Sequence, residues 1–481
     1  MSKTVNNKHL ILMPNGQNLP VSQAMDRAVN HHQLGRVLRA AEIYRKILNV
    51  EPTYADAKHL LGIAERQQGN FKEAIKLINA AIKLNPGTAV YYNNLSQAYR
   101  ASGDLNKAGV AGKKAISLDA NIPEAHVNIG AILFENGDFN AAIEAYKKAL
   151  SLRKGYIDAM LGLGDCFLKT DQFEAGLEQF QAVLLCEKDN IAALTRTGIA
   201  LRLLGRIDEA IEHYKKSIVL LPSEPDLYNN LSCLYQRENR PEEAAECLRV
   251  LLKLTPDDVV SRHSLNALEG STTETAPAEY VRELFDNYAD DFDSHLVDKL
   301  GYHTPEMLLK AILSSITKHN DLAVLDLGCG TGLMGDILHE YCAHLSGVDL
   351  APKMIDQARN RGIYHELAVG DVLEFMGSRG DASLDLVVAA DVFVYIGKLD
   401  ALFCEARRLL SSGGIFSFSV EVAFEKDVDF LLNETGRYSH SKSYLNALQA
   451  SYGFSEEYFE KAHIRNNHGK PVYGYLCVYS V

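Results

Sequence analysis

The sequence predicts a two-domain protein, in which an all-α superhelix of short repeats precedes an α/β domain with a doubly wound sheet. Three observations carry this prediction. The first half repeats with a period of 34 residues, the second half alternates apolar strands with helical stretches, and one strand runs into a glycine-rich turn. The chain has 481 residues, which is long enough for two or three domains that each bury a core.

Composition and charge narrow the functional classes. The apolar content of 47% and the charged content of 23% are ordinary for a globular protein. The formal net charge of −13 argues against a nucleic-acid backbone as the main partner, because such binding needs positive charge. Eight scattered cysteines without a Cys-x-x-Cys pair favour reduced thiols in a cytoplasmic protein and no metal site. Residues 1–20 are expected to form an N-terminal tail, whose apolar run is too short for a signal peptide or a membrane span.

Three ladders of residues, each in steps of 34, mark seven repeats within residues 21–258. One ladder consists of the prolines at 52, 86, 222 and 256. Another holds residues that tolerate the left-handed conformation at the end of a helix: Gly35, Gly69, Gly103, Gly137, Asp171, Gly205 and Asn239. The last holds small residues that let two helices approach closely: Ala40, Ala74, Ala108, Ala142, Gly176, Ala210 and Ala244. Each repeat is therefore predicted to be a pair of helices.

This pattern resembles the tetratricopeptide repeat, over about half of the chain. The resemblance implies a superhelix with a concave groove that binds a protein or peptide partner. We expect the recurring aromatics to form core between repeats: Tyr44, Tyr146, Phe180 and Tyr214. Asn94 and Asn128 share one position of the first helix, where an amide can hydrogen-bond an extended peptide. The alternative is that the repeat consensus itself favours asparagine there.

The repeats and the second domain are joined by a short connection, residues 259–279. Residues 259–268 are expected to form a helix that caps the array. Residues 269–277 are polar, contain Gly and Pro, and have the composition of a linker. The second domain is then predicted to span residues 280–481.

The second domain is predicted to contain a seven-stranded sheet. Apolar strand candidates occur at 323–327, 345–348, 365–369, 384–389, 414–420, 457–464 and 472–479. Helical stretches separate the earlier strands, which indicates parallel pairing. The last two strands are joined by residues 465–470, which are too few for a crossover helix, so we expect an antiparallel hairpin at the end of the sheet.

Acidic residues stand at the strand ends, where ligands of such sheets bind. Asp326 ends the first strand and precedes the turn that contains Gly328, Gly330 and Gly332, which lack side chains that would block a ligand. Asp349 closes the second strand, where a carboxylate can accept both hydroxyls of a ribose. Two further acids follow the third and fourth strands, namely Asp371 and Asp391.

A nicotinamide enzyme is an alternative, because Gly330, Gly332 and Gly335 satisfy the dinucleotide fingerprint. Asp326 argues against it, since its negative charge would repel a pyrophosphate. A closing antiparallel hairpin is also unusual for a dinucleotide domain. A cationic cofactor without phosphate suits the site better.

Leu-Asp-Leu-Gly-Cys-Gly-Thr-Gly (325–332), together with Asp349 and Asp371, resembles the Rossmann-like S-adenosylmethionine-dependent methyltransferases. This resemblance covers the second half and implies S-adenosyl-L-methionine as cofactor. The implied cofactor-binding residues are Asp326, Gly328, Cys329, Gly330, Gly332, Asp349, Leu350, Asp371, Val372 and Asp391. Cys329 is expected there mainly as a small residue between glycines.

The acceptor side is predicted in two segments. Residues 280–305 resemble the N-terminal lid of such methyltransferases, with aromatics on one helical face: Phe285, Tyr288 and Phe292. A Gly- and Ser-rich loop at 435–444 suggests acceptor recognition by Arg437 and Tyr438. His440 is the candidate catalytic base, and Tyr395 is a second catalytic candidate at the mouth of the cleft.

These features predict a methyltransferase whose repeats recruit a protein or peptide acceptor. One alternative is a methyltransferase for a small-molecule or carrier-bound acceptor, and another is an adaptor with an inactive Rossmann-like domain. The sequence lacks the Asn/Asp-Pro-Pro-Tyr signature of adenine-amino methylation and the Pro-Cys of cytosine methylation. The domain order resembles bacterial tetratricopeptide-containing predicted methyltransferases, which have no settled substrate.

Overall fold

The computed structural model describes residues 10–13, 17–286, 289, 292–294, 301–316, 320–425, 428–467 and 470–481. The chain divides into two compact units, Met1–Ser223 and Glu224–Val481. None of the helices in the described part has the length and apolar character needed to cross a bilayer.

The predicted N-terminal tail is partly folded, while its residues 1–9 and 14–16 lie outside the described part. Strands β1 (Leu10–Leu12) and β2 (Asn18–Pro20) pair as an antiparallel hairpin. Ile11 and Met13 are buried and join the core of the first two helices. The short apolar run therefore covers the start of the array, which corrects the expectation of a plain tail.

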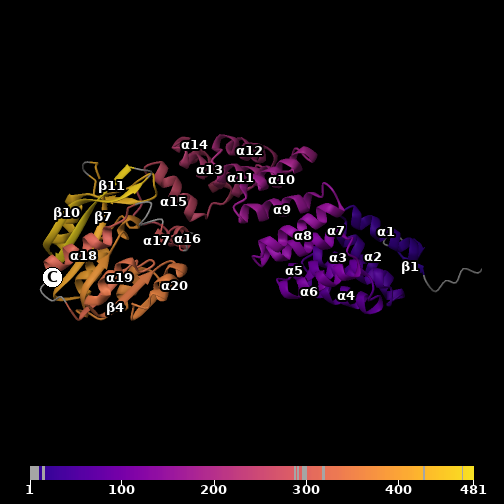
Figure 1. Cartoon of the computed structure of the whole chain (residues 1–481), viewed down its shortest axis with the longest axis horizontal. Coiled ribbons are helices and arrows are strands. Elements are labelled where there is room, and N and C mark those ends of the chain that lie inside the picture. Colours follow the sequence, from indigo (N-terminus) through magenta and orange to yellow (C-terminus); the bar gives the residue numbers. More distant parts are fainter. Residues whose placement is uncertain are drawn as a thin grey trace, which may run out of the picture. The chain divides into compact units, whose positions relative to one another are not determined.

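Twelve described helices in the first unit form six consecutive pairs (Figure 1). Their bounds are α1 (Val21–Gln33), α2 (Val37–Val50), α3 (Ala55–Gln67), α4 (Phe71–Leu84), α5 (Ala89–Ala101), α6 (Leu105–Leu118), α7 (Pro123–Glu135), α8 (Phe139–Leu152), α9 (Ile157–Lys169), α10 (Phe173–Cys186), α11 (Ile191–Leu203) and α12 (Ile207–Leu220).

The sequence ladders occupy the positions that the repeat geometry requires. All seven members of the second ladder have positive φ, including the non-glycine residues Asp171 (56°) and Asn239 (55°). The small residues of the third ladder are buried. The four aromatics are buried as predicted, and Phe180 packs so closely on Gly164 that a Cβ there would lie 2.4 Å from the ring. Close approach of neighbouring helices thus depends on small residues facing large ones.

The seventh helix pair belongs to the second unit. It consists of α13 (Pro225–Arg237) and α14 (Pro241–Leu254), and the predicted capping helix α15 (Val259–Leu268) follows. Residues 21–258 thus contain seven helix pairs, but the last pair groups with the α/β domain. The sequence contained no signal for this grouping, because the 34-residue pattern continues through residue 223.

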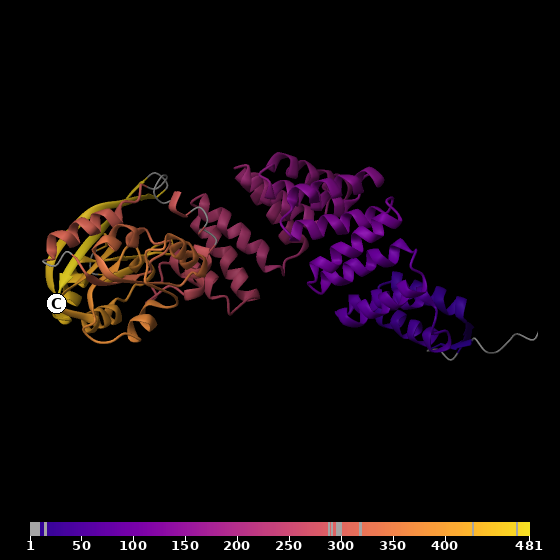
Figure 2. The ribbon, with the colours of Figure 1, turned by 60° about the horizontal axis from the view of Figure 1, so that its bottom comes forward.

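All seven predicted strands of the α/β domain are present (Figure 2). They are β3 (Leu322–Leu327), β4 (Cys342–Asp349), β5 (Glu366–Val369), β6 (Leu384–Ala389), β7 (Leu410–Val422), β10 (Ser455–Asn467) and β11 (Lys470–Ser480). Their order is β10-β11-β7-β6-β3-β4-β5, with β3 to β7 parallel and β10 and β11 antiparallel.

The sheet has nine strands rather than the predicted seven, because two short strands attach to the end of β7. They are β8 (Phe430–Leu432) and β9 (Tyr438–His440), and β9 pairs in parallel with β7. The predicted Gly- and Ser-rich loop at 435–444 therefore contains a buried strand. Three residues are too few to show the alternating pattern by which a strand is recognised in a sequence.

Helices cover both faces of this sheet. They are α16 (Ala278–Asp286), α17 (Phe292–Ser294), α18 (Thr304–Ser315), α19 (Leu333–Leu338), α20 (Pro352–Arg361), α21 (Val372–Gly377), α22 (Asp400–Leu409) and α23 (Lys442–Ser451). Two cores result, one centred on Phe403, Phe416 and Phe418, the other on Leu308, Val324 and Leu338.

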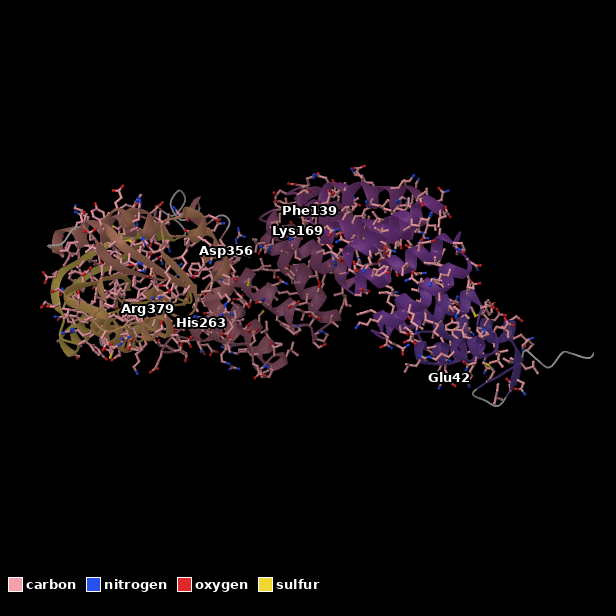
Figure 3. All side chains as sticks on the ribbon, turned by 90° about the horizontal axis from the view of Figure 1, so that it is seen from below. Glu42, Phe139, Lys169, His263, Asp356 and Arg379 are labelled. Atoms are coloured by element: carbon pink, nitrogen blue, oxygen red, sulfur yellow. The ribbon has the colours of Figure 1, made fainter. Side chains whose placement is uncertain are left out.

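Residues 271–277, predicted as a linker, are held against the α/β domain, and we call them the strap. Glu274 O accepts hydrogen bonds from Gly397 N at 2.9 Å and Lys398 N at 2.8 Å, and Ala276 N donates to Tyr395 O at 3.0 Å. His263 of α15 (Figure 3) is buried, and its Nε2 lies 3.0 Å from Gly436 O. The polar groups of the strap therefore hydrogen-bond the α/β domain, in place of the linker that the composition predicted.

Candidate functional site

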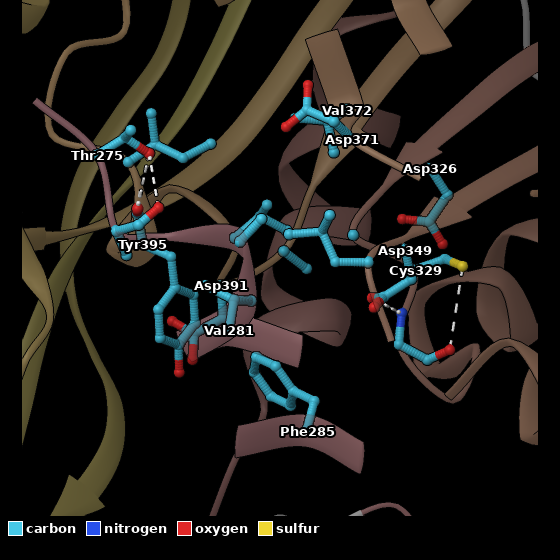
Figure 4. Close-up of a pocket in the computed structure, with 18 of the residues that line it drawn as sticks. Thr275, Val281, Phe285, Asp326, Cys329, Asp349, Asp371, Val372, Asp391 and Tyr395 are labelled. Atoms are coloured by element: carbon cyan, nitrogen blue, oxygen red, sulfur yellow. Dashed lines mark hydrogen bonds between the residues drawn. The ribbon is translucent and has the colours of Figure 1, made fainter. Parts of the chain in front are cut away.

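A cavity of about 680 Å³ opens at the carboxyl ends of β3, β4, β5 and β6 (Figure 4). Predicted residues that line it are Asp326, Gly328, Cys329, Gly330, Asp349, Leu350, Asp371, Val372, Asp391, Tyr395 and Arg437. Gly332, Tyr438 and His440 do not line it. Further parts of the wall come from the strap and α16, which contribute Thr275, Pro277, Val281 and Phe285.

The three glycines of the turn are needed for different reasons. All have positive φ, at 59° for Gly328, 55° for Gly330 and 94° for Gly332. A Cβ at Gly328 would lie 2.6 Å from Val392 Cγ2, and one at Gly332 would lie 3.1 Å from Arg361 and Tyr364. At Gly330 a Cβ would meet no protein atom within 4 Å. The expectation that all three leave room for a ligand is therefore correct only for Gly330, while the other two leave room for protein side chains.

Asp349 ties the glycine turn to the end of β4. Its two oxygens accept from Gly330 N at 2.9 Å and Ala351 N at 2.8 Å. Burial raises the pKa of Asp349 to about 6, although these backbone bonds oppose the rise. Asp371 caps α21, where its Oδ1 accepts from Leu373 N at 2.8 Å and Glu374 N at 3.2 Å. A ligand would use the remaining lone pairs of Asp349 and the second oxygen of Asp371.

Asp326 is a buried acid at the end of β3. Its Oδ2 accepts from Tyr364 Oη at 2.7 Å. Burial raises the pKa of Asp326 to about 7, the tyrosine bond opposes this, and the neighbouring Asp349 charge adds to it. Cys329 lies between the two acids, and burial raises the pKa of its thiol well above the usual value. Among the described residues, none brings a positive charge against these carboxyl groups, a setting that favours a cationic ligand.

The predicted lid contributes aromatic rings to the cavity wall and a carboxylate that binds the glycine turn. Tyr288, the third predicted lid aromatic, lies outside the described residues. Phe285 and Phe292 both line the cavity and contact one another edge-on at 5.9 Å between centroids. Asp293 accepts from Thr331 Oγ1 at 2.5 Å and pairs with Arg361 Nη2 at 2.5 Å. Because Thr331 belongs to the glycine turn, Asp293 holds the lid over that turn.

A carboxylate–guanidinium cluster forms the other end of the cavity. Arg465 Nη1 donates to both oxygens of Asp391 at 3.0 and 2.9 Å, and its Nη2 donates to Glu421. Asp391 has φ 62°, in the left-handed region that aspartate adopts more readily than most residues with a side chain. The sequence placed Asp391 at the cofactor, whereas the structure pairs it with Arg465 beside the cavity.

Tyr395 and Arg437 complete this end. The Arg437 guanidinium lies 5.4 Å from the Tyr395 ring centroid, and its nearest carboxylate is Glu421 at 3.7 Å. Tyr395 is 5% exposed, and its hydroxyl has no hydrogen-bond partner within the described structure. Burial raises the pKa of Tyr395, so the phenol stays protonated and can donate. Both residues line the cavity, and both carry donors that have no acceptor within hydrogen-bond distance in the described structure.

The prediction of His440 as the base is wrong on geometric grounds. His440 is fully buried in β9, and its Nε2 lies 3.0 Å from Ile396 O and 2.9 Å from Gly397 O. Because both partners are carbonyls, Nε2 is the donor. Burial lowers the pKa of His440 to about 4. Tyr438, predicted to recognise the acceptor, is buried too and bonds Thr273 Oγ1 of the strap at 2.5 Å. Both residues position the cavity wall instead.

Asn94 and Asn128 bond neighbouring repeats. Asn94 Nδ2 lies 2.8 Å from His59 Nε2, and the buried Asn128 donates to Asn93 Oδ1 at 2.7 Å. Gln97 Nε2 donates to Asn128 Oδ1 at 3.3 Å. Asn128 therefore has an inter-repeat role in place of the predicted peptide contact.

Sequence reasoning missed Arg465, Tyr302, Tyr364 and the strap. Arg465 was assigned to the turn of the C-terminal hairpin, but β10 extends to Asn467 and buries the guanidinium. Tyr302 lines the cavity and Tyr364 holds Asp326, yet neither belongs to a motif. The sequence marked these residues only by their position near a predicted strand end or in the predicted lid. Many residues without a role in the site share such positions.

Family models match both halves of the chain. Residues 325–418 match a methyltransferase domain model. Tetratricopeptide repeat models match residues 31–99, 133–196, 89–122 and 225–258, and a further repeat model matches 198–239.

Curated methyltransferases match 23–30% of this chain. A malonyl-[acyl-carrier protein] O-methyltransferase of Serratia marcescens is 31% identical over 112 residues, which cover 23% of this chain and 43% of the relative. A ubiquinone biosynthesis O-methyltransferase of Xylella fastidiosa is 30% identical and covers 23% of this chain and 50% of the relative. The chain thus spans about half the length of the curated relatives it matches.

Solved structures resemble the first half. YrrB, described as a tetratricopeptide repeat protein with an unusual peptide-binding site, is 23% identical at a TM-score of 0.34 and covers 39% of this chain and 96% of its own. The pilus biogenesis factor PilW is 18% identical at a TM-score of 0.41 and covers 42% of this chain and 94% of its own. Taken together, the family models and the fold make this chain a tetratricopeptide repeat-containing protein with a class I methyltransferase domain.

Proposed function

We propose that this protein transfers a methyl group from S-adenosyl-L-methionine to an acceptor that its repeats recruit. The observation that carries the proposal is the acidic end of the cavity. Burial raises the pKa of both Asp326 and Asp349, and the described residues place no cation against either carboxyl group. A ligand that carries a sulfonium and an ammonium group supplies the missing positive charge.

The residues present fit this cofactor. Gly330 leaves open space where a Cβ would be, so the ligand can approach the backbone of the turn. Asp326 would hold the amino-acid end, and Asp349 would accept the ribose hydroxyls with its free lone pairs. Asp371 and Val372 would meet the adenine, since both line the cavity at the end of β5.

When bound, the cofactor supplies an electrophilic methyl group on a sulfonium. The chain contributes positioning and exclusion of water, which dominate catalysis of an in-line displacement. Phe285, Phe292 and the strap enclose the cavity, and Asp293 fastens the lid to Thr331. No imidazole occurs among the described lining residues. The lysine among them, Lys398, is paired with Glu274 at 3.0 Å.

Recruitment of the acceptor is assigned to the repeats. Tetratricopeptide arrays present a groove to protein or peptide partners, and this supports a protein or peptide acceptor. The names of the curated relatives support the alternative of a small-molecule or carrier-bound acceptor. A cytoplasmic location is part of the proposal, supported by eight free cysteines.

Calorimetry with S-adenosylmethionine and S-adenosylhomocysteine tests the cofactor. We expect micromolar binding of both, and no binding at millimolar ligand would overturn the proposal in favour of an inactive adaptor. Labelled cofactor with a fractionated lysate then tests the acceptor. Label in a protein fraction supports recruitment of a protein, whereas label only in small molecules supports the alternative.

A further inference from the structure

We propose that the acceptor carries a carboxylate, which Arg437 and Tyr395 bind at the end of the cavity opposite the glycine turn. The inference rests on the proposed methyl transfer and names the acceptor class of that same site. Its starting point is that the buried Arg465 and the half-buried Arg437 differ in how many hydrogen-bond acceptors the protein gives them.

Arg465 is fully satisfied by the protein. It is 4% exposed and donates to both oxygens of Asp391 and to Glu421. A guanidinium and two carboxylates on one side of the cluster leave one negative charge in excess. Arg437 balances that charge from a longer distance, so what its guanidinium lacks is hydrogen-bond acceptors and not a counter-charge.

Arg437 has no comparable partner within the described structure. Its guanidinium reaches Glu421 only at 3.7 Å, beyond hydrogen-bond distance, and the same carboxylate already accepts from Arg465. The Arg437 side chain is 27% exposed and lines the cavity, whereas that of Arg465 is 5% exposed. A guanidinium carries five N–H donors in a planar fork that matches a carboxylate. Those donors are available to a ligand.

Tyr395 adds a second donor at the same place. Its ring contacts Phe285 edge-on at 5.4 Å between centroids (Figure 4), and the Arg437 guanidinium lies 5.4 Å from its centroid, so the ring is held by both neighbours. That hydroxyl is buried and unpaired in the described structure. A buried donor without a partner costs free energy, so its retention points to a ligand oxygen that completes it.

Asp391, a carboxylate at this end of the cavity, is already paired, which agrees with an acceptor that needs no base. Asp391 is held by Arg465 through both oxygens, and His440 lies outside the cavity. A carboxylic acid is already ionised at neutral pH, so its methylation requires no proton removal. One carboxylate oxygen forms the new C–O bond as the S–CH₃ bond breaks with its electron pair left on sulfur. The anion and the sulfonium are both neutralised, and no proton is released.

The rest of this end is apolar and suits an aliphatic chain attached to the carboxylate. Val281 and Phe285 line it from α16, while Pro277 and Ile396 line it from the strap and the segment after β6. Hexanoate is therefore the first probe, and hexanamide is its uncharged counterpart of the same shape.

The test is calorimetric titration of the full chain with hexanoate and hexanamide, with and without S-adenosylhomocysteine. We expect hexanoate to bind at least tenfold more tightly than hexanamide. Arg437→Met should lower hexanoate affinity at least tenfold, Arg437→Lys less, and Tyr395→Phe about threefold to tenfold. Arg407→Met removes an exposed arginine at the end of α22 and should change nothing. Unchanged S-adenosylhomocysteine binding shows that each variant is folded.

Equal binding of hexanoate and hexanamide, or no effect of Arg437→Met, would overturn the carboxylate inference. If S-adenosylhomocysteine still binds in that case, the proposed function stands and only the acceptor class is wrong. An acetylated peptide amide with one glutamate distinguishes the source of the carboxylate. Tighter binding of the peptide assigns it to a protein side chain, and tighter binding of hexanoate assigns it to a small or carrier-bound acid.

Discussion

Alanine at Gly328 should mainly lower stability and alanine at Gly330 should mainly lower ligand affinity, although both glycines belong to one turn. Both have similar positive φ values, 59° and 55°, so each alanine should cost about 1–2 kcal/mol of backbone strain. At Gly328 the new methyl would also lie 2.6 and 2.9 Å from the two methyls of Val392. Such overpacking adds about 1–3 kcal/mol, for a total near 2–5 kcal/mol.

At Gly330 the methyl meets no protein atom within 4 Å and enters the cavity. Gly330→Ala should therefore lose only about 1–2 kcal/mol of unfolding free energy, from backbone strain alone. It should lower S-adenosylhomocysteine affinity more than tenfold, because the methyl occupies space beside Asp349 that the ligand needs. Gly328→Ala should keep most of its affinity in the fraction that is folded.

Urea unfolding of the full chain and calorimetry with S-adenosylhomocysteine measure the two effects separately. Gly328→Ala combined with Val392→Ala is the matched control, since it removes both close methyls and should recover part of the lost stability. The reasoning would be refuted if Gly330→Ala bound the ligand as wild type does. It would also be refuted if Gly328→Ala were no less stable than Gly330→Ala.

The remaining predictions concern three buried polar groups. Burial raises the pKa of Asp326 to about 7, so between about pH 4 and pH 7 the folded state holds a proton that the unfolded state has lost. The stability of the cofactor-free protein should therefore fall as the pH rises through this range. Asp326→Asn should flatten this dependence in urea titrations at several pH values, and an unchanged slope would contradict the assignment. His440→Ala should lower the free energy of unfolding by about 1–3 kcal/mol, because two buried carbonyls lose their hydrogen-bond donor. Its S-adenosylhomocysteine affinity should stay near wild type. A large loss of affinity without a loss of stability would show that His440 belongs to the site after all. Asn128→Ala should destabilise the repeats by about 1–3 kcal/mol through loss of its bonds to Asn93 and Gln97, and an equally stable variant in thermal unfolding would disprove that role.

Much of the fold was predictable because its signals are local or periodic. The 34-residue ladders identified the helix pairs, since every repeat needs the same turn residue and the same close contact. The seven main strands and the acids at their ends were predictable because parallel strands bring their carboxyl ends to one edge. Asp326, Asp349 and Asp371 accordingly reach the cavity as expected.

Errors arose where a short segment was judged by composition. Residues 435–444 are rich in Gly and Ser, yet they contain β9, which is buried beside β7. The strap has the composition of a linker, but Thr275 and Tyr395, 120 positions apart, are within hydrogen-bond distance there. A polar composition indicates solvent exposure only on average. Polar groups can instead be hydrogen-bonded by a strand that is distant in the sequence, which satisfies them as well as water does.

The sequence alone determined the helix pairs, the seven main strands and the acids at the strand ends, because local or periodic patterns specify each of them. Tertiary structure alone decided the acceptor end. It pairs Asp391 with Arg465, 74 positions away, and it buries His440 against the carbonyl of Ile396, outside the cavity. Arg437 and Tyr395 line the cavity, and the Tyr395 hydroxyl has no hydrogen-bond partner in the described structure. Which charged groups satisfy one another depends on distances between strands that are remote in the chain, and no local pattern encodes those distances.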